Sequence, residues 1–146
     1  MGPRANEEIY DSPKGWVASH IDDYVTSGGR KGHRWNGVDI LLLTTRGRKT
    51  GKLRRTALIY GTERAAYVVV ASVGGAPKHP EWYLNLVAEP LVTIQVGADV
   101  FDARARIANG EERSRLWAEM AGIFPNYDAY QLRTDREIPV VVIEPI

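Results

Sequence analysis

A cluster of positive charge stands between two apolar runs in residues 41–60, LLLTTRGRKTGKLRRTALIY. No acidic residue lies in this stretch, and its basic members are Arg46, Arg48, Lys49, Lys52, Arg54 and Arg55. Guanidinium and ammonium groups, a threonine hydroxyl and the free N–H groups of a glycine-containing loop suit phosphate or carboxylate oxygens. The residue types leave two interpretations open, an anion-binding loop and a hairpin tip kept basic for solubility.

The loop GRKTGK (47–52) lacks the common nucleotide-binding motifs. It has one residue too few between its glycines for a Walker A loop, and Leu53 stands where Ser or Thr should follow the lysine. No strand-like segment leads into G-x-G-x-x-G, so a Rossmann dinucleotide site is unsupported. An anion held by this loop would therefore be bound in another way.

A second group of candidate residues lies in ASVGGAPKHPEWYLNL, residues 71–86. Ser72, Gly74 and Gly75 occupy the turn between a strand-like segment and a helix-like one. Glycines at such a turn let a ligand approach backbone N–H groups, and the helix N-terminus that follows favours an anion. Trp82 and Asn85 lie about one helical turn apart and can face the same ligand, although aromatic residues at helical spacing more often pack in a core.

Strands are the elements that must position these groups. Six segments are rich in β-branched and aromatic residues and are bounded by turn residues: 38–45, 55–61, 65–73, 91–96, 100–107 and 138–144. In 100–107 the apolar residues alternate with Asp102, Arg104 and Arg106. Short turns join most of the six segments, which indicates an antiparallel sheet or a small barrel.

Helical patterns fill the gaps between these strands. Residues 109–123 open with Asn109 and Glu112 in capping-box spacing, and residues 80–90 lie between two prolines. The chain is predicted to be one globular domain, mainly β with helices (α+β). In it, residues 1–37 form an N-terminal helix and connector, and residues 38–146 form the barrel. The acidic segment 7–24 is expected to cover a ligand pocket rather than to bind a bilayer, because surface-binding helices are usually basic.

Composition excludes several classes of function. The 146 residues include 19 basic and 18 acidic ones, so the net charge of +1 argues against a nucleic-acid-binding protein. The chain has no cysteine, and its three histidines show no metal-ligand spacing, so neither thiolate catalysis nor a metal site is expected. No apolar run approaches the roughly 20 residues that span a bilayer. A cytoplasmic protein is expected, with at most peripheral contact with the inner face of the membrane.

Three segments resemble the deazaflavin-dependent nitroreductase family: LLTTRGRKTGKLR, VVVASVGGAPKHPEWYLNLVAEPLVTIQV and FPNYDAYQLRTDREIPVVVIEP. Its members are actinobacterial reductases that use the 8-hydroxy-5-deazaflavin coenzyme F420. The resemblance runs from about Asp39 to Pro145. It implies a six-stranded split β-barrel related to the barrels of flavin-binding oxidoreductases, which agrees with the strand pattern.

The resemblance also implies where the coenzyme binds. A phosphate and a polyglutamate tail make it anionic at one end, and its ring is flat and aromatic. By position, the tail region falls to Arg48, Lys49, Thr50 and Arg54, and the ring region to Ser72, Gly74, Trp82 and Asn85. The chain departs from the family at Val73, where Lys is common, and at Ala57, where Pro is common. His79 stands where Asn is usual and is expected to cap the next helix.

Hydride transfer from the reduced coenzyme to electron-poor acceptors is the implied reaction, with quinones, enones, coumarin-type lactones or nitroaromatics as candidate substrates. Tyr127, Tyr130 and Ser72 are the candidate catalytic proton donors, and each tyrosine has the alternative role of a wall residue. Phe124, with Tyr127 and Trp82, is expected to contact the substrate; it replaces a tyrosine of the family's nitroimidazole-activating member. The alternative function is a non-catalytic protein that binds deazaflavin or another anionic ligand.

Overall fold

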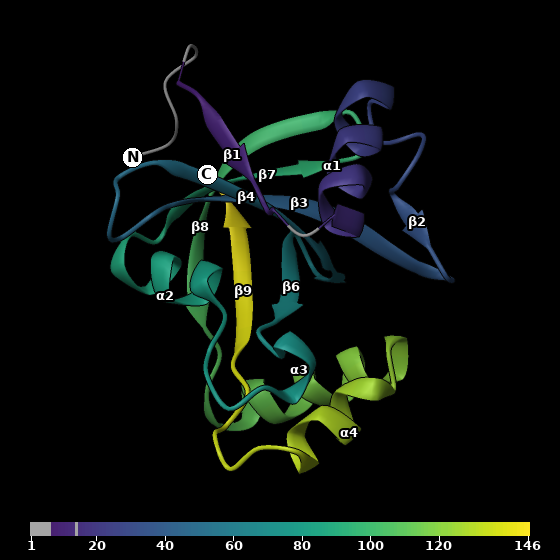
Figure 1. The fold of residues 1–146 in the computed structure, drawn as a ribbon. Helices are drawn as coiled ribbons and strands as arrows, with labels where there is room; N and C mark the ends of the chain where they lie inside the picture. Colours follow the sequence, from purple (N-terminus) through teal and green to yellow (C-terminus); the bar gives the residue numbers. More distant parts are fainter. Residues whose placement is uncertain (1–6, 14) are drawn as a thin grey trace.

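The computed structural model describes residues 7–13 and 15–146, in which a sheet bends into a barrel with helices at its sides (Figure 1). The strands are β1 Ile9–Asp11, β2 Arg34–Trp35, β3 Val38–Arg46, β4 Leu53–Ile59, β5 Gly61–Glu63, β6 Ala66–Val70, β7 Leu91–Val96, β8 Asp99–Ile107 and β9 Val140–Pro145. The helices are α1 Gly15–Ser27, α2 Glu81–Ala88, α3 Gly110–Ile123 and α4 Asn126–Leu132, with a 3₁₀ turn η1 Val73–Gly75 before α2. The start of the predicted N-terminal region, residues 1–6, and residue 14 lie outside the described part.

Six strand runs close the barrel. The sheet order is β1-β4-β3-β7-β8-β9-β6-β5, and β2 pairs with β3 at one side. Only Tyr60 separates β4 from β5, so residues 53–63 form one bent run that pairs with β3 at one end and with β6 at the other. The predicted fold class, an α+β split barrel, is confirmed. The six predicted segments correspond to β3, this bent run, β6, β7, β8 and β9.

Side-chain alternation builds one core inside the barrel and two outside it. Leu41 and Leu43 of β3 belong to the interior cluster, whereas Leu42 packs outward with Ile21 of α1. On β6 and β9 the outward residues pack with Leu116 of α3, and α3 and α4 lie together at the far end from α1 (Figure 1). β3 is therefore buried on both faces, which explains its nearly continuous apolar sequence.

Several local predictions are wrong. The predicted N-terminal helix begins only at Gly15 as α1, because Ile9–Asp11 before it forms the unpredicted strand β1 in parallel with β4. The predicted strand 65–73 ends at Val70, and residues 126–132, for which no element was predicted, form the helix α4. Asn109 precedes α3 but makes no side-chain cap hydrogen bond, and Glu112 pairs with Arg106 instead. In the part of the chain that the structure describes, no helix has both the length and the apolar character to cross a membrane.

Candidate active site

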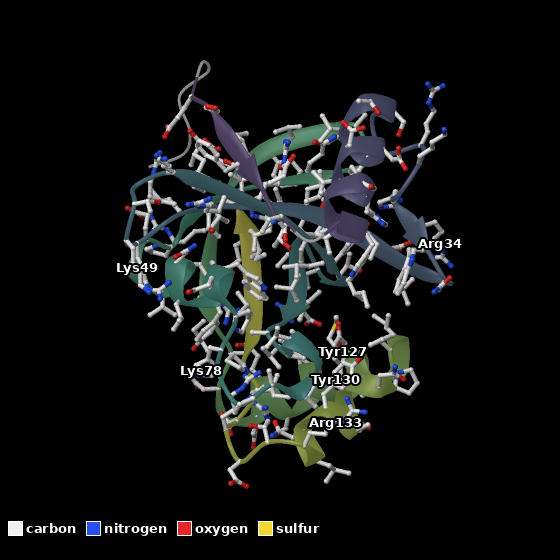
Figure 2. All side chains as sticks on the ribbon, in the orientation of Figure 1. Arg34, Lys49, Lys78, Tyr127, Tyr130 and Arg133 are labelled. Carbon is white, nitrogen blue, oxygen red and sulfur yellow. The ribbon has the colours of Figure 1, made fainter. Side chains whose placement is uncertain are left out.

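A cavity of about 1450 Å³ opens between four parts of the fold: the β3–β4 loop, the turn before α2, the helix α1 and the helix α4. Every predicted site residue lines it: Arg48, Lys49, Thr50, Arg54, Ser72, Gly74, Trp82, Asn85, Phe124, Tyr127 and Tyr130. Figure 2 shows its two ends: Lys49 lies on the β3–β4 loop at the left, whereas Tyr127 and Tyr130 lie on α4. The barrel thus brings together three segments that are distant in the sequence.

The basic hairpin (residues 46–55) forms one end of the cavity. Its loop is closed by hydrogen bonds from the Gly47 N–H to the Lys52 carbonyl, 2.7 Å, and from the Gly51 N–H to the Gly47 carbonyl, 2.8 Å. Two of its arginines are already neutralised, Arg46 by Glu7 and Arg55 by Asp11. These ion pairs fix the base of the hairpin.

The other basic residues of the hairpin differ in how they are held. Arg48 donates to Glu81, 2.7 Å, and this hydrogen bond lowers the pKa of the Glu81 carboxyl. Lys52 and Arg54 lie over the ring of Tyr10, at 4.9 and 5.4 Å from its centroid. Lys49 is exposed and forms no ion pair with any residue in 7–13 or 15–146. Lys49 is therefore the most available cation of the hairpin for an anionic ligand.

Asn85 connects this hairpin to α2. Its side chain is 5% exposed, and its Oδ1 accepts from both the N–H and the guanidinium of Arg48, at 3.2 Å each. Its Nδ2 donates to the Thr45 hydroxyl at 3.3 Å. The contacts in the structure thus make Asn85 a link that sets the position of Arg48, and its predicted contact with the coenzyme stays a prediction.

The glycine turn (residues 72–76) borders the middle of the cavity. Val73, Gly74 and Gly75 all have left-handed backbones, with φ of 39°, 65° and 78°. A Cβ at Gly75 would lie 2.5 Å from the carbonyl oxygen of Tyr130, so only glycine fits there. A positive φ is strained for a β-branched residue such as Val73, and strain of this kind persists only where the surroundings hold it.

Arg136 is the main functional candidate that the sequence did not reveal. Its side chain lines the cavity and donates to the carbonyl oxygens of Ala71, Ser72 and Ala76. It also donates to Nδ1 of His79 at 3.0 Å, so His79 does not cap α2 as predicted. Burial and then the charge of Arg136 lower the pKa of His79, and because a guanidinium can only donate, Nδ1 of His79 is the acceptor in this contact. No local pattern could reveal contacts between residues so far apart in the chain.

Aromatic side chains of α4 and the segment before it form the other end. Tyr127 is 4% exposed, with the Phe124 ring 5.1 Å and the Tyr130 ring 6.3 Å from its own. Burial, and then the neighbouring Tyr130, raises the pKa of Tyr127 well above its ordinary value. Within the described chain its hydroxyl has no hydrogen-bond partner, although it borders the cavity. Tyr127 is thus a protonated phenol that can donate to a bound molecule.

Residues before the barrel complete the wall. Trp16 of α1 and Trp35 of β2 both line the cavity and stack on each other, with ring centroids 6.4 Å apart. The N-terminal segment therefore borders the pocket, as expected. Trp82 is partly buried against the barrel core, and its ring lies edge-on to Tyr83. Trp82 also lines the cavity.

Comparisons with known proteins agree on one family. Residues 16–145 match the family described as F420H(2)-dependent quinone reductase. A protein of that name from Mycobacterium tuberculosis is 44% identical over 128 residues, which cover 85% of this chain and 86% of the relative. A solved F420-H2 dependent reductase, FDR-A, is 46% identical, with a TM-score of 0.67 over 72% of this chain and 93% of its own. A structure described as a domain-swapped dimer is 41% identical, with a TM-score of 0.71 over 91% of this chain and 100% of its own.

Proposed function

The chain belongs to the F420H(2)-dependent quinone reductase family, and on that basis we propose that its cavity holds reduced coenzyme F420 beside a quinone and directs a hydride from one to the other. It is an oxidoreductase that uses this coenzyme. The observation that best supports the site assignment is that one cavity joins an unpaired cation, Lys49, to a buried phenol without a described partner, Tyr127.

The residues present fit such a coenzyme. A phosphate and a carboxylate-rich tail need cations and N–H donors, which the basic hairpin supplies through Arg48, Lys49, Thr50 and Arg54. A flat ring needs close approach to backbone and an aromatic or apolar wall, and the glycine turn with Trp82 supplies both. The bound coenzyme would supply the hydride itself, since carbon in place of the flavin nitrogen at ring position 5 favours two-electron over one-electron chemistry.

The chain's own contribution is to orient the acceptor and to supply one proton. When a hydride adds to a quinone, two electrons and one proton arrive, and negative charge builds on a quinone oxygen until a second proton neutralises it. We assign Tyr127, which lines the cavity, to donate that proton or to hydrogen-bond the oxygen, with Ser72, Tyr130 or water as the other candidate donors. Phe124 and Tyr130 place apolar ring surface beside the Tyr127 ring, and an apolar surrounding of this kind strengthens a donor's interaction with developing charge.

The residue at position 124 is expected to influence which acceptors the protein reduces. Phe124 lines the cavity 5.1 Å from Tyr127 and offers no hydroxyl to a polar substrate. We expect activity on quinones, then on enones and coumarin-type lactones, and little on nitroimidazoles, because a buried polar group without a partner costs about 1–3 kcal/mol. Phe124→Tyr should raise the nitroimidazole rate and leave coenzyme affinity unchanged.

The measurement is an acceptor panel with the native protein and Phe124→Tyr, following oxidation of the reduced coenzyme by its absorbance. Ile123→Val, at an exposed position beside Phe124 that does not line the cavity, is the matched control. Efficient nitroimidazole reduction by the native protein would show that Phe124 does not set acceptor choice. Coenzyme binding with no turnover on any quinone would favour the non-catalytic alternative.

A further inference from the structure

We propose that Arg136 is a positioning residue of the coenzyme site, which holds the carbonyl groups of the glycine turn so that the N–H groups of Ser72 and Val73 face the cavity as a pair of donors. Such a pair suits a carbonyl oxygen or an unprotonated nitrogen of a planar ring. The identity of that ring as the deazaflavin rests on the proposed function. The role of Arg136 in fixing the conformation of the turn is independent of the proposed function.

The contacts of the guanidinium are specific. Nε donates to the Ala76 carbonyl at 2.8 Å, and one terminal nitrogen donates to the Ser72 carbonyl at 2.8 Å. The other terminal nitrogen donates to the Ala71 carbonyl at 3.2 Å and to His79 at 3.0 Å. Four of the five N–H groups that a guanidinium offers are thus used on this one turn and its flank. Within 7–13 and 15–146 no carboxylate pairs with Arg136, so its polar contacts there are with carbonyl oxygens and the His79 ring.

The geometry of the peptide unit explains what these contacts achieve. In a trans peptide the C=O and the N–H point in opposite directions, and the described chain has no cis peptide bond. The Ala71 carbonyl shares a peptide unit with the Ser72 N–H, and the Ser72 carbonyl shares one with the Val73 N–H. Because both carbonyls point at Arg136, both N–H groups point away from it, and none of the described backbone hydrogen bonds uses either of them.

The turn needs an external support of this kind. Three successive left-handed residues, one of them the β-branched Val73, are not a conformation that the chain holds by itself. The internal bonds of the turn run from Gly75 N–H to the Ser72 carbonyl and from Ala76 N–H to the Val73 carbonyl, so they leave the Ala71 peptide free to rotate. Arg136 fixes that peptide and the next one. A lysine could not replace it, because an ammonium is a compact charge without the planar fork that reaches three carbonyls.

The test compares Arg136→Ala and Arg136→Lys with Arg133→Ala. Arg133 lies three residues away, stacks on Tyr130 and reaches the Gly74 carbonyl only at 3.4 Å, so it controls for the loss of one nearby positive charge. Coenzyme F420 affinity is measured by titration of tryptophan fluorescence. We expect the dissociation constant to rise about 10- to 100-fold in Arg136→Ala, since misplacement of a binding group by about 1 Å has effects of that size. Arg136→Lys should fall between Ala and the native protein, and Arg133→Ala should bind as the native protein does.

Two further readouts separate positioning from a general loss of stability. Methylguanidinium added to folded Arg136→Ala should restore part of the affinity, because the deleted side chain borders the open cavity. Amide hydrogen exchange in the ligand-free proteins should become faster within residues 71–76 in Arg136→Ala and Arg136→Lys, but not in Arg133→Ala. Exchange does not depend on the coenzyme, so it tests the hold on the turn even if the coenzyme assignment fails.

The proposal is overturned if either Arg136 variant binds the coenzyme as tightly as the native protein, or if exchange at 71–76 is unchanged in both. It is also overturned if both variants lose affinity only in proportion to a drop in melting temperature and methylguanidinium restores nothing. A native protein that does not bind coenzyme F420 at all would instead refute the proposed function, and the exchange data would still decide the role of Arg136.

Discussion

Replacing Tyr127 by phenylalanine is expected to lower kcat for quinone reduction by about 10- to 1000-fold, the range for loss of one proton or oxyanion donor. The hydroxyl is the only part removed, and within the described chain it has no hydrogen-bond partner. Folding and coenzyme affinity should therefore stay close to native. The measurement is steady-state kinetics with a soluble naphthoquinone, alongside a coenzyme titration on the same preparation.

Tyr130→Phe is the matched control for this prediction. Tyr130 lines the same cavity 6.3 Å from Tyr127, but it is less buried and its ring contacts Arg133. A loss of turnover in Tyr130→Phe with none in Tyr127→Phe would move the donor role to Tyr130. Full activity in both would make the two tyrosines wall residues and leave Ser72 or water as the proton donor.

The double variant Arg48→Ala/Lys49→Ala is expected to weaken coenzyme binding by about 10- to 100-fold at low ionic strength, because charge-assisted contacts that are partly exposed retain only part of their strength. The native affinity should fall as salt rises, and the variant should show a shallower salt dependence. The Lys49→Ala change removes only a charge. The Arg48→Ala change also removes the contacts that connect the hairpin to α2 through Glu81 and Asn85.

Arg30→Ala/Lys31→Ala provides the comparison for net charge. Arg30 and Lys31 lie between α1 and β2, outside the cavity lining. Their replacement removes the same number of positive charges as the hairpin variant. If this pair weakens binding as much as the hairpin pair, the effect belongs to the field of the whole protein and not to the loop. If neither pair changes affinity or its salt dependence, the hairpin is a solubility feature.

The barrel could be predicted because its signals are local. Alternation in β8 places Ala103 and Ala105 inside and Arg104 outside, and such a pattern needs no knowledge of the partner strand. The basic hairpin was predictable for the same reason, since Arg46 pairs with Leu53 across a short loop. The family resemblance then indicated that the basic hairpin and the glycine turn would bind the same ligand.

The remaining features depend on contacts between distant segments. Arg136 acts on carbonyl oxygens about sixty residues away, and a carbonyl leaves no mark in the sequence. β1 pairs with the edge of β4, and the three residues of β1 carry no sign of that pairing in the sequence. The short α4 is fixed largely by the burial of its own Tyr127 and by contact with the glycine turn, where the backbone of Tyr130 leaves no room for a side chain at Gly75.

The most direct test of the account is to mix the purified protein anaerobically with reduced coenzyme F420 and a soluble naphthoquinone and to follow the absorbance of the oxidised coenzyme. The account predicts rapid, protein-dependent oxidation with one hydroquinone formed per coenzyme, and no comparable reaction when NADPH replaces the coenzyme, since no dinucleotide-binding motif is present. Coenzyme that binds but is not oxidised, or quinone reduced equally well with NADPH, would contradict it.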